Sequence, residues 1–291
     1  MVNQLMNTKE LAEYVRLKER SVYNLVATQR IPFTRVTGKL LFPKVLIDSW
    51  LLDQAESVPT IALLPHVIAG SHDPLLEWAV RESGSELALL FDGSLAGLER
   101  LAQRRAVASG LHVIDSDTKS YNVPQVRARL PREPVVVLEW AWREQGLIVA
   151  ADNPLGIERL ADLNRVRFAA RQPEAGSRLL LDHLLRTEGL RPETVHADGP
   201  PLRTETEVAL AVSEGRADVG LGIAAVARQL NLDLVPLTRE RYDLLIWRRA
   251  YFEPPLQRLL AFCASAAFAA KAENLGGYDV SGLGRVHYNG P

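Results

Sequence analysis

Apolar runs alternate with segments of helical periodicity through most of this chain, and this alternation limits the possible fold more than any other feature. The runs with the length of buried strands are residues 61–68, 87–91, 111–114, 135–140, 147–151, 166–170, 218–222 and 232–237. Helical patterns separate most of them, which is typical of α/β folding with mostly parallel sheets. The sequence therefore predicts an α/β architecture for residues 61–291.

Two neighbouring runs indicate how this region is divided. Residues 135–140 and 147–151 follow each other almost without a break, as expected where a chain crosses between two lobes. A return crossing is expected near residues 237–246. The predicted lobes are lobe I, about residues 61–140 and 245–291, and lobe II, about residues 146–238.

Composition excludes several classes of protein. The single cysteine, Cys263, rules out a disulfide framework and a Cys-based zinc site, and the six histidines show no metal-ligand spacing. We therefore expect no metal and no cofactor. No apolar run reaches the ~18 residues of a membrane span, and the amino terminus lacks a basic segment followed by an apolar core. We expect a cytoplasmic protein without a membrane partner.

The first fifty residues differ from the rest in charge and in pattern. They carry eight Lys and Arg against four Asp and Glu, whereas the whole chain has a net charge of −1. Asn7 and Glu10 have the spacing of a capping box, and a second apolar helical stripe follows a polar break at residues 16–18. Residues 31–42 alternate apolar and polar around Gly38, as in a hairpin. Pro43 suits the first turn of a closing helix.

These elements predict a winged helix-turn-helix at residues 1–55, followed by a linker at residues 56–60. Arg, Asn and Ser side chains can pair with base edges, and Tyr and Lys side chains can contact phosphates. The candidate DNA-binding residues are Lys18, Arg20, Ser21, Tyr23, Asn24, Arg30, Arg35 and Lys39.

A known family shares this pattern over roughly residues 6–52. It is carried by Thr8, Glu10, Leu11, Ala12, Arg20, Ser21, Val22, Tyr23, Ile31, Pro32, Arg35, Gly38, Phe42 and Trp50. The segment resembles the winged helix-turn-helix of the excisionase and MerR-like family, which implies binding to double-stranded DNA. It departs from the family at Leu40-Leu41, where a basic residue is common. The alternative is a small helical domain that docks a protein.

Three later loops place small residues and a hydroxyl at the start of a helix. They are Gly70-Ser71-His72-Asp73-Pro74, Asp92-Gly93-Ser94 and the loop at residues 171–178. Unsatisfied N–H groups and the positive end of the helix dipole gather at such positions. Three converging loops could hold a small anion.

Residues 60–285 also show a family resemblance, carried by the loops above and by residues 143–147, 153–154, 167–178, 206–209, 215–222 and 241–244. They resemble the type II periplasmic-binding-protein fold, and specifically the cytoplasmic substrate-binding-like domain related to molybdate-binding proteins that follows a helix-turn-helix in bacterial regulators. The resemblance implies an oxyanion held by Ser71, Ser94 and Gly176-Ser177. The chain departs from the family at Ala170, where relatives commonly have Asn, and at Glu174-Ala175, in a loop that relatives make from Gly and Ser. Glu174 adds a carboxylate near the cleft, which argues against a molybdate-like dianion.

Charged side chains near these loops could bind a carboxylate or a larger anion by charge-assisted hydrogen bonds. The candidate ligand-binding residues are Ser71, His72, Gly93, Ser94, Arg171, Gly176, Ser177, Arg178, Thr206 and Gly222. No catalytic residues are predicted, because the neighbours Ser71-His72-Asp73 are not expected to point at one another as a hydrolytic triad requires.

Together these features predict a ligand-responsive DNA-binding transcriptional regulator, and not an enzyme. Its ligand would be a small anion, either a molybdate- or tungstate-like oxyanion or a small carboxylate, bound between the lobes. A single small DNA-binding domain contacts few base pairs, so a homodimer or higher homo-oligomer on a two-part DNA operator is expected. The alternatives are a solute-binding protein without a regulatory role and an enzyme that uses the cleft.

Overall fold

The chain forms two compact units, residues 1–63 and residues 64–291. The computed structural model describes residues 5–36, 38–53, 64–197 and 199–291. The predicted linker at residues 56–60 lies outside the described residues, so its boundaries stay a prediction. Each unit is described by itself below.

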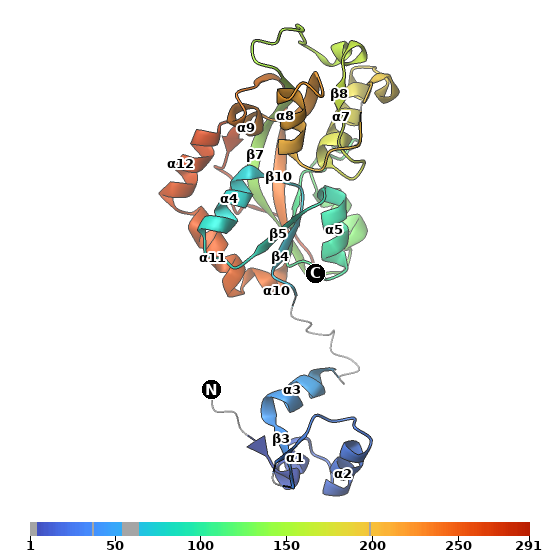
Figure 1. Ribbon diagram of the computed structural model, residues 1–291, viewed down its shortest axis with the longest axis vertical. Coiled ribbons are helices and arrows are strands. Elements are labelled where there is room, and N and C mark those ends of the chain that lie inside the picture. Colours follow the sequence, from blue (N-terminus) through green and yellow to red (C-terminus); the bar gives the residue numbers. More distant parts are fainter. Residues whose placement is uncertain (1–4, 37, 54–63, 198) are drawn as a thin grey trace. The chain divides into compact units, whose positions relative to one another are not determined.

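The first unit is a small helical domain with a three-stranded antiparallel sheet of order β1-β3-β2 (Figure 1). Its elements are β1 (Leu5–Met6), α1 (Thr8–Tyr14), α2 (Glu19–Ala27), β2 (Thr34–Val36), β3 (Lys39–Pro43) and α3 (Lys44–Asp53). The predicted hairpin is β2 and β3, and the two helices before it are α1 and α2. Pro43 ends β3 and does not open the closing helix, which begins one residue later, at Lys44.

Local chemistry and one apolar cluster hold this unit together. The Asn7 side chain accepts hydrogen bonds from the amides of Lys9 and Glu10, and Glu10 accepts one from the Asn7 amide, so the predicted capping box is present. The fully buried core side chains are Leu11, Val22, Phe42 and Ile47. The apolar stripe of α2 therefore faces inward and leaves its polar face in solvent.

The second unit is built on a nine-stranded sheet with the order β5-β4-β6-β10-β7-β9-β8, and β11 and β12 pair with β7. The strands are β4 (Val67–Gly70), β5 (Ala88–Phe91), β6 (Ala108–Leu111), β7 (Val135–Val149), β8 (Phe168–Ala169), β9 (Val219–Ile223), β10 (Asp233–Trp247), β11 (Tyr278–Asp279) and β12 (Val286–Asn289). The helices are α4 (Pro74–Glu82), α5 (Ser94–Ala102), α6 (Val123–Arg129), α7 (Gly176–Thr187), α8 (Glu205–Ser213), α9 (Ala224–Gln229), α10 (Arg248–Tyr251), α11 (Pro254–Cys263) and α12 (Ala266–Leu275). Short 3-10 turns span Leu160–Arg165 and Pro192–Thr194.

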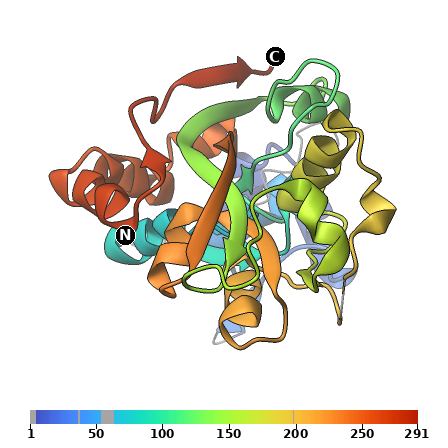
Figure 2. The ribbon, with the colours of Figure 1, turned by 90° about the horizontal axis from the view of Figure 1, so that it is seen from above.

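Two long antiparallel strands, β7 and β10, join the two lobes of this unit (Figure 2). One end of each strand lies in a core with β4, β6, α4 and α5, which we call lobe I. The other end packs with a second core around Leu147, Leu180 and Leu221, which we call lobe II. The two runs predicted at residues 135–140 and 147–151 are one uninterrupted strand, and the predicted return crossing is part of β10. The lobe boundaries drawn from the sequence stay predictions.

The expectation of mostly parallel sheets is wrong. Strand β4 is parallel to β5 and β6, and β8 is parallel to β9, but every pairing that β7 and β10 make is antiparallel. The physical reason is the double crossing. Strand β7 leaves lobe I and β10 returns to it, so each runs opposite to its neighbours.

The strand predicted at residues 111–114 is displaced toward the amino terminus, because β6 spans Ala108–Leu111. Its residues Ala108, Ser109 and Gly110 are small, so they give no apolar signal. Small size is required there. A Cβ atom on Gly110 would lie 1.8 Å from the hydroxyl of Tyr242 on β10. Within the part of the chain that is described, no helix is long and apolar enough to cross a membrane.

Candidate functional site

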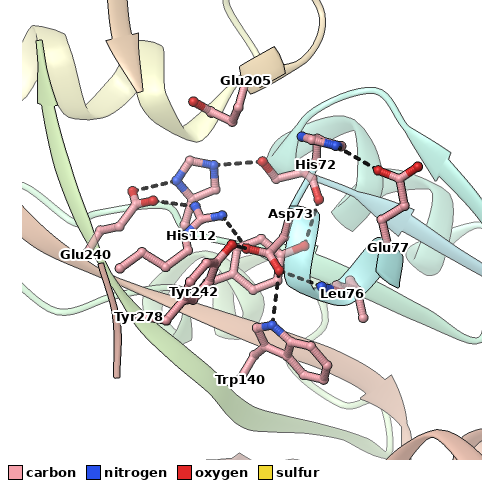
Figure 3. A network of polar contacts seen from close by, with 12 residues as sticks. His72, Asp73, Leu76, Glu77, His112, Trp140, Glu205, Glu240, Tyr242 and Tyr278 are labelled. Carbon is pink, nitrogen blue, oxygen red and sulfur yellow. Dashed lines mark hydrogen bonds and ion pairs between the residues drawn. The ribbon is translucent and has the colours of Figure 1, made fainter. Parts of the chain in front are cut away.

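A fully buried chain of hydrogen bonds runs through the junction of the two lobes (Figure 3). His112, just after β6, contacts the Ser71 hydroxyl through Nε2 at 2.8 Å and the Glu240 carboxylate through Nδ1 at 2.7 Å. A carboxylate only accepts hydrogen bonds, so Nδ1 carries a proton. When the ring is neutral, Nε2 carries no proton and accepts a hydrogen bond from the Ser71 hydroxyl.

A second set of contacts surrounds the guanidinium of Arg143, which β7 carries into the junction. Arg143 donates to Asp73 at 3.0 Å and to the other oxygen of Glu240. Asp73 is the N-cap of α4, and its carboxylate accepts a hydrogen bond from the Leu76 amide at 2.7 Å. It also accepts from Trp140 Nε1 at 3.2 Å and from the Tyr278 hydroxyl at 2.7 Å. One carboxylate thus joins the start of α4 to β7 and to the C-terminal segment.

Lobe II contributes the starts of α7 and α8 to the same junction. Gly176 opens α7 against His112, and a Cβ atom at this glycine would lie 2.7 Å from His112 Nε2. Glu205 opens α8, and its Oε1 atom accepts from Arg171 at 2.6 Å. The other Glu205 oxygen and the Ser177 hydroxyl are buried, and neither has a hydrogen-bond partner among the described residues.

The starts of α5 and α7 approach each other across the junction, and neither helix has a side-chain cap. The amide of Leu95 donates to the Glu174 carbonyl at 3.2 Å, and the Gln172 side chain donates to the Asp92 carbonyl at 3.2 Å. Gly93 precedes α5 with a φ of +101°, a backbone conformation that favours glycine. Two uncapped helix starts therefore lie close to buried Ser and His side chains.

The predicted ligand-binding residues divide into two groups. The structure brings together those at the helix starts, which are Ser71, Gly93, Ser94, Gly176 and Ser177, and Ser94 Oγ accepts from the His112 amide at 3.3 Å. Gly222 lies beside this group, since a Cβ atom there would be 3.1 Å from the free Glu205 oxygen. Thr206 is half-buried, one residue after Glu205.

Three predicted charged residues have other contacts. His72 Nε2 lies 3.2 Å from a carboxylate oxygen of Glu77, and the His72 ring packs edge-on against Phe91. Arg171 donates to Glu205 and to two backbone carbonyls of its own lobe, so it holds Glu205 in place. Arg178 pairs with Asp182 one turn further along α7 and is partly exposed. Their roles toward a ligand stay predictions.

Sequence reasoning missed the residues at the centre of the junction. They are His112, Arg143, Gln145, Glu205 and Glu240. A signal for Arg143 and Gln145 was present, because polar side chains within a long apolar strand must find partners when they are buried. His112 follows a strand of small residues, so its neighbourhood carried no comparable signal.

As expected, the neighbours Ser71, His72 and Asp73 do not form a triad, because His72 turns to Glu77 and Asp73 to Arg143. Ser71, His112 and Glu240 nevertheless have the connectivity of a nucleophile, a base and an orienting carboxylate. Glu240 differs from the usual orienting group in that it also accepts from Arg143 and Gln145. The Ser71 hydroxyl is fully buried.

The charge of Glu240 makes stability depend on pH. Burial alone would raise its pKa, but Arg143, His112 and Gln145 stabilise the carboxylate and hold its pKa at about 2. A pKa below that of the unfolded chain adds stability above the unfolded value of 4.5, and this stability is lost as pH falls toward 2. We expect Glu240→Gln to cost more stability at pH 7 than at pH 3 in urea unfolding. An equal cost at both pH values would contradict this.

The first unit exposes the residues predicted to bind DNA. Lys18 precedes α2, and Arg20, Ser21, Tyr23 and Asn24 lie on it. Arg30 follows α2, while Arg35 and Lys39 lie on the two strands of the hairpin. All eight are solvent-exposed, as contact with DNA requires. Their roles in binding stay predictions.

Comparisons with known proteins agree with this division of the chain. A family described as the PBP superfamily domain matches residues 76–264, and one described as a helix-turn-helix domain matches residues 5–55. The uncharacterized protein YvgK of Bacillus subtilis (strain 168) is 27% identical over 300 residues, which cover 96% of each chain. An uncharacterized protein from the 5' region of the 2Fe-2S ferredoxin gene of Clostridium pasteurianum is 32% identical over 109 residues, 37% of this chain and 96% of that protein.

Solved structures share the fold of the second unit. The sulfate-binding protein SubI of Mycobacterium tuberculosis H37Rv has a TM-score of 0.51 at 13% identity, and the match covers 74% of this chain and 86% of SubI. A Clostridium perfringens protein assigned to phosphate ABC transport as its substrate-binding protein has a TM-score of 0.54 at 12% identity, over 72% of this chain and 96% of that one. At such identities the likeness concerns the fold alone.

Proposed function

Because the chain belongs to the PBP superfamily and also carries a helix-turn-helix domain, we propose that it is a ligand-responsive transcriptional regulator. The observation that carries the proposal is the presence in one chain of an exposed basic helix-turn-helix and a two-lobed domain with uncapped helix starts at its junction. A regulator of this kind works where the DNA is, in the cytoplasm, and needs no catalytic residue.

In this proposal, α2 enters the major groove and the hairpin contacts the backbone. Arg20, Ser21 and Asn24 share the exposed face of α2 and have side chains that pair with base edges. Arg35 and Lys39 on the hairpin are placed to contact phosphates. One such DNA-binding domain contacts few base pairs, so sequence specificity requires a homodimer or higher oligomer on a two-part operator.

The ligand binds at the lobe junction through an anionic group. The starts of α5 and α7 offer backbone N–H groups and the positive ends of two helix dipoles. Ser94 and Ser177 add hydroxyls at the same positions, and Ser177 Oγ has no hydrogen-bond partner among the described residues. A molybdate-like oxyanion and a small carboxylate both satisfy this part of the site. The ligand changes the protein to the extent that it binds the closed form more tightly than the open one.

Arg20→Ala and Arg35→Ala test the DNA-binding half of this proposal. Each is expected to weaken binding to a mixed-sequence DNA duplex about tenfold, because each removes a charged contact with DNA. Arg35→Ala should also reduce the dependence of DNA affinity on salt concentration by the amount expected for the loss of about one phosphate contact. Fluorescence anisotropy at several salt concentrations measures both effects.

Arg132→Ala is the matched control, since Arg132 is an exposed arginine of the second unit. It should leave DNA affinity unchanged. If Arg20→Ala and Arg35→Ala also left the affinity unchanged, the helix-turn-helix would have another partner, and a solute-binding role without regulation would fit better.

A further inference from the structure

The buried charges at the lobe junction show no positive excess that would favour a dianion. Asp73, Glu205 and Glu240 contribute three carboxylates, and Arg143 and Arg171 contribute two guanidinium groups. All five side chains are at least 96% buried. His112 adds at most one positive charge, and one of its nitrogens already contacts Glu240. A molybdate, sulfate or phosphate dianion would therefore enter a cluster whose own charges are negative or neutral.

Four buried side-chain atoms at the junction lack a hydrogen-bond partner among the described residues: Arg143 Nε can only donate, the Ser177 hydroxyl can donate or accept, and two oxygens can only accept. Glu205 Oε2 and Gln145 Oε1 are buried, and neither has a partner among the described residues. A carboxylate oxygen and an amide oxygen can only accept. A buried acceptor without a donor is destabilising, so a well-matched ligand must bring a donor of its own. An oxyanion without bound protons brings none.

Two different environments thus meet at one junction. Helix starts with N–H groups and the Ser94 and Ser177 hydroxyls favour a negative group. The Glu205 side chain lies above the His112 ring in Figure 3, and its free oxygen favours a positive group that donates hydrogen bonds. Arg171 pairs only with the other Glu205 oxygen and leaves this one available.

We propose that the ligand is a small zwitterion of the amino-acid type. Its carboxylate binds at the starts of α5 and α7, and its protonated amino group donates to the free oxygen of Glu205. This inference rests on the proposed function, because it assigns the ligand class of the same site. It narrows the two anion classes to a carboxylate and adds a requirement for an amino group.

The first experiment measures thermal unfolding of the full chain with each of the twenty common L-amino acids, and with molybdate, sulfate and phosphate. A ligand that binds the folded form raises the unfolding midpoint. We expect at least one amino acid to raise it and the three oxyanions to leave it unchanged. Titration calorimetry then compares this amino acid with the matching acid that lacks the amino group. We expect that acid to bind about a hundredfold more weakly, because Glu205 remains unpaired.

Glu205→Gln tests the role of Glu205, and Glu193→Gln is the control because Glu193 is exposed on the short 3-10 turn Pro192–Thr194. Glu205→Gln should weaken amino-acid binding about tenfold or more and should reduce the preference over the matching acid, because a charged acceptor becomes neutral. Glu193→Gln should change neither the affinity nor the preference. If Glu205→Gln does not fold, the preference of the natural chain for the amino acid over its matching acid still decides the question.

Three results would overturn the proposal of a zwitterionic ligand. The unfolding midpoint could rise with an oxyanion and with no amino acid, no compound tested could change the midpoint, or the preference for the amino acid over its matching acid could be independent of Glu205. The first would leave the proposed function standing with an oxyanion ligand. The DNA-binding measurements on Arg20 and Arg35 do not depend on this site. A failure of the proposed regulatory function can therefore be distinguished from a failure of the proposed zwitterionic ligand.

Discussion

Replacing Arg143 with Met is expected to lower the free energy of unfolding by about 3–5 kcal/mol at neutral pH. The guanidinium is fully buried between Asp73 and Glu240, and it donates to both carboxylates. Methionine fills similar space but supplies no charge and no hydrogen-bond donor. Two carboxylates would then be buried without their shared counter-ion, which is the situation that costs most. Urea unfolding at pH 7 measures the loss.

Arg216→Met is the matched control for this measurement. Arg216 forms an ion pair with Glu214, but both side chains are more than half exposed. Exposed pairs contribute little, so this variant should change stability by no more than about 0.5 kcal/mol. If the two variants lost similar stability, the charges around Arg143 would be solvated, and the charge balance from which we argue against a dianion ligand would no longer hold.

Patterns within a few residues of one another predicted the first unit well. The capping box of Asn7 and Glu10 is a contact across three residues, and the hairpin pairs Thr34 with Leu41. Both depend on local geometry, so spacing alone indicates them. The end of the hairpin was missed by one residue at Pro43, because a proline is as compatible with the last residue of a strand as with the first turn of a helix.

The larger unit shows what local patterns cannot contain. Strand β6 was misplaced because packing against Tyr242 selects small residues in β6, and Tyr242 is more than 130 residues away in the sequence. Strand β7 was divided in two because Arg143 and Gln145 interrupt its apolar pattern. Their partner, Glu240, lies on the antiparallel strand β10. Strand direction also follows from the double crossing and not from any segment by itself.

The candidate site was predicted in the same uneven way. The helix starts at Ser71, Ser94 and Gly176 could be found, because each is a short motif that follows a strand. Their partners could not. His112 meets Ser71 across 41 residues and Glu240 across 128. A resemblance to oxyanion-binding relatives indicated where a ligand is expected, but the charges from which we infer its class come from these distant partners.

Gly176→Ala is expected to separate the two lobes where the start of α7 packs against His112. A Cβ atom at this position would lie 2.7 Å from His112 Nε2 and 2.8 Å from the His112 carbonyl oxygen. The carbonyl belongs to the backbone of lobe I and cannot turn aside, so the start of α7 must move away. Overpacking of this kind costs about 1–3 kcal/mol, which corresponds to a change of roughly 5- to 150-fold in the opening equilibrium.

Hydrogen exchange measures this opening without any ligand. The Leu95 amide donates to the Glu174 carbonyl across the junction, whereas the Val107 amide donates to the Val67 carbonyl within lobe I. We expect Gly176→Ala to speed exchange at Leu95 about tenfold or more relative to Val107, because only the first bond crosses between lobes. Gly84→Ala is the control. Its φ of +60° makes alanine unfavourable there, but no atom lies within 4 Å of the added Cβ.

The control should therefore lose stability and keep the ratio of the two exchange rates. An unchanged ratio in Gly176→Ala would mean that the lobes do not depend on this contact to stay together. A raised ratio would show that a single methyl group at the start of α7 shifts the protein toward its open form. Since a ligand can act only through the balance between these forms, the same variant should respond to ligand at higher concentrations than the natural chain does.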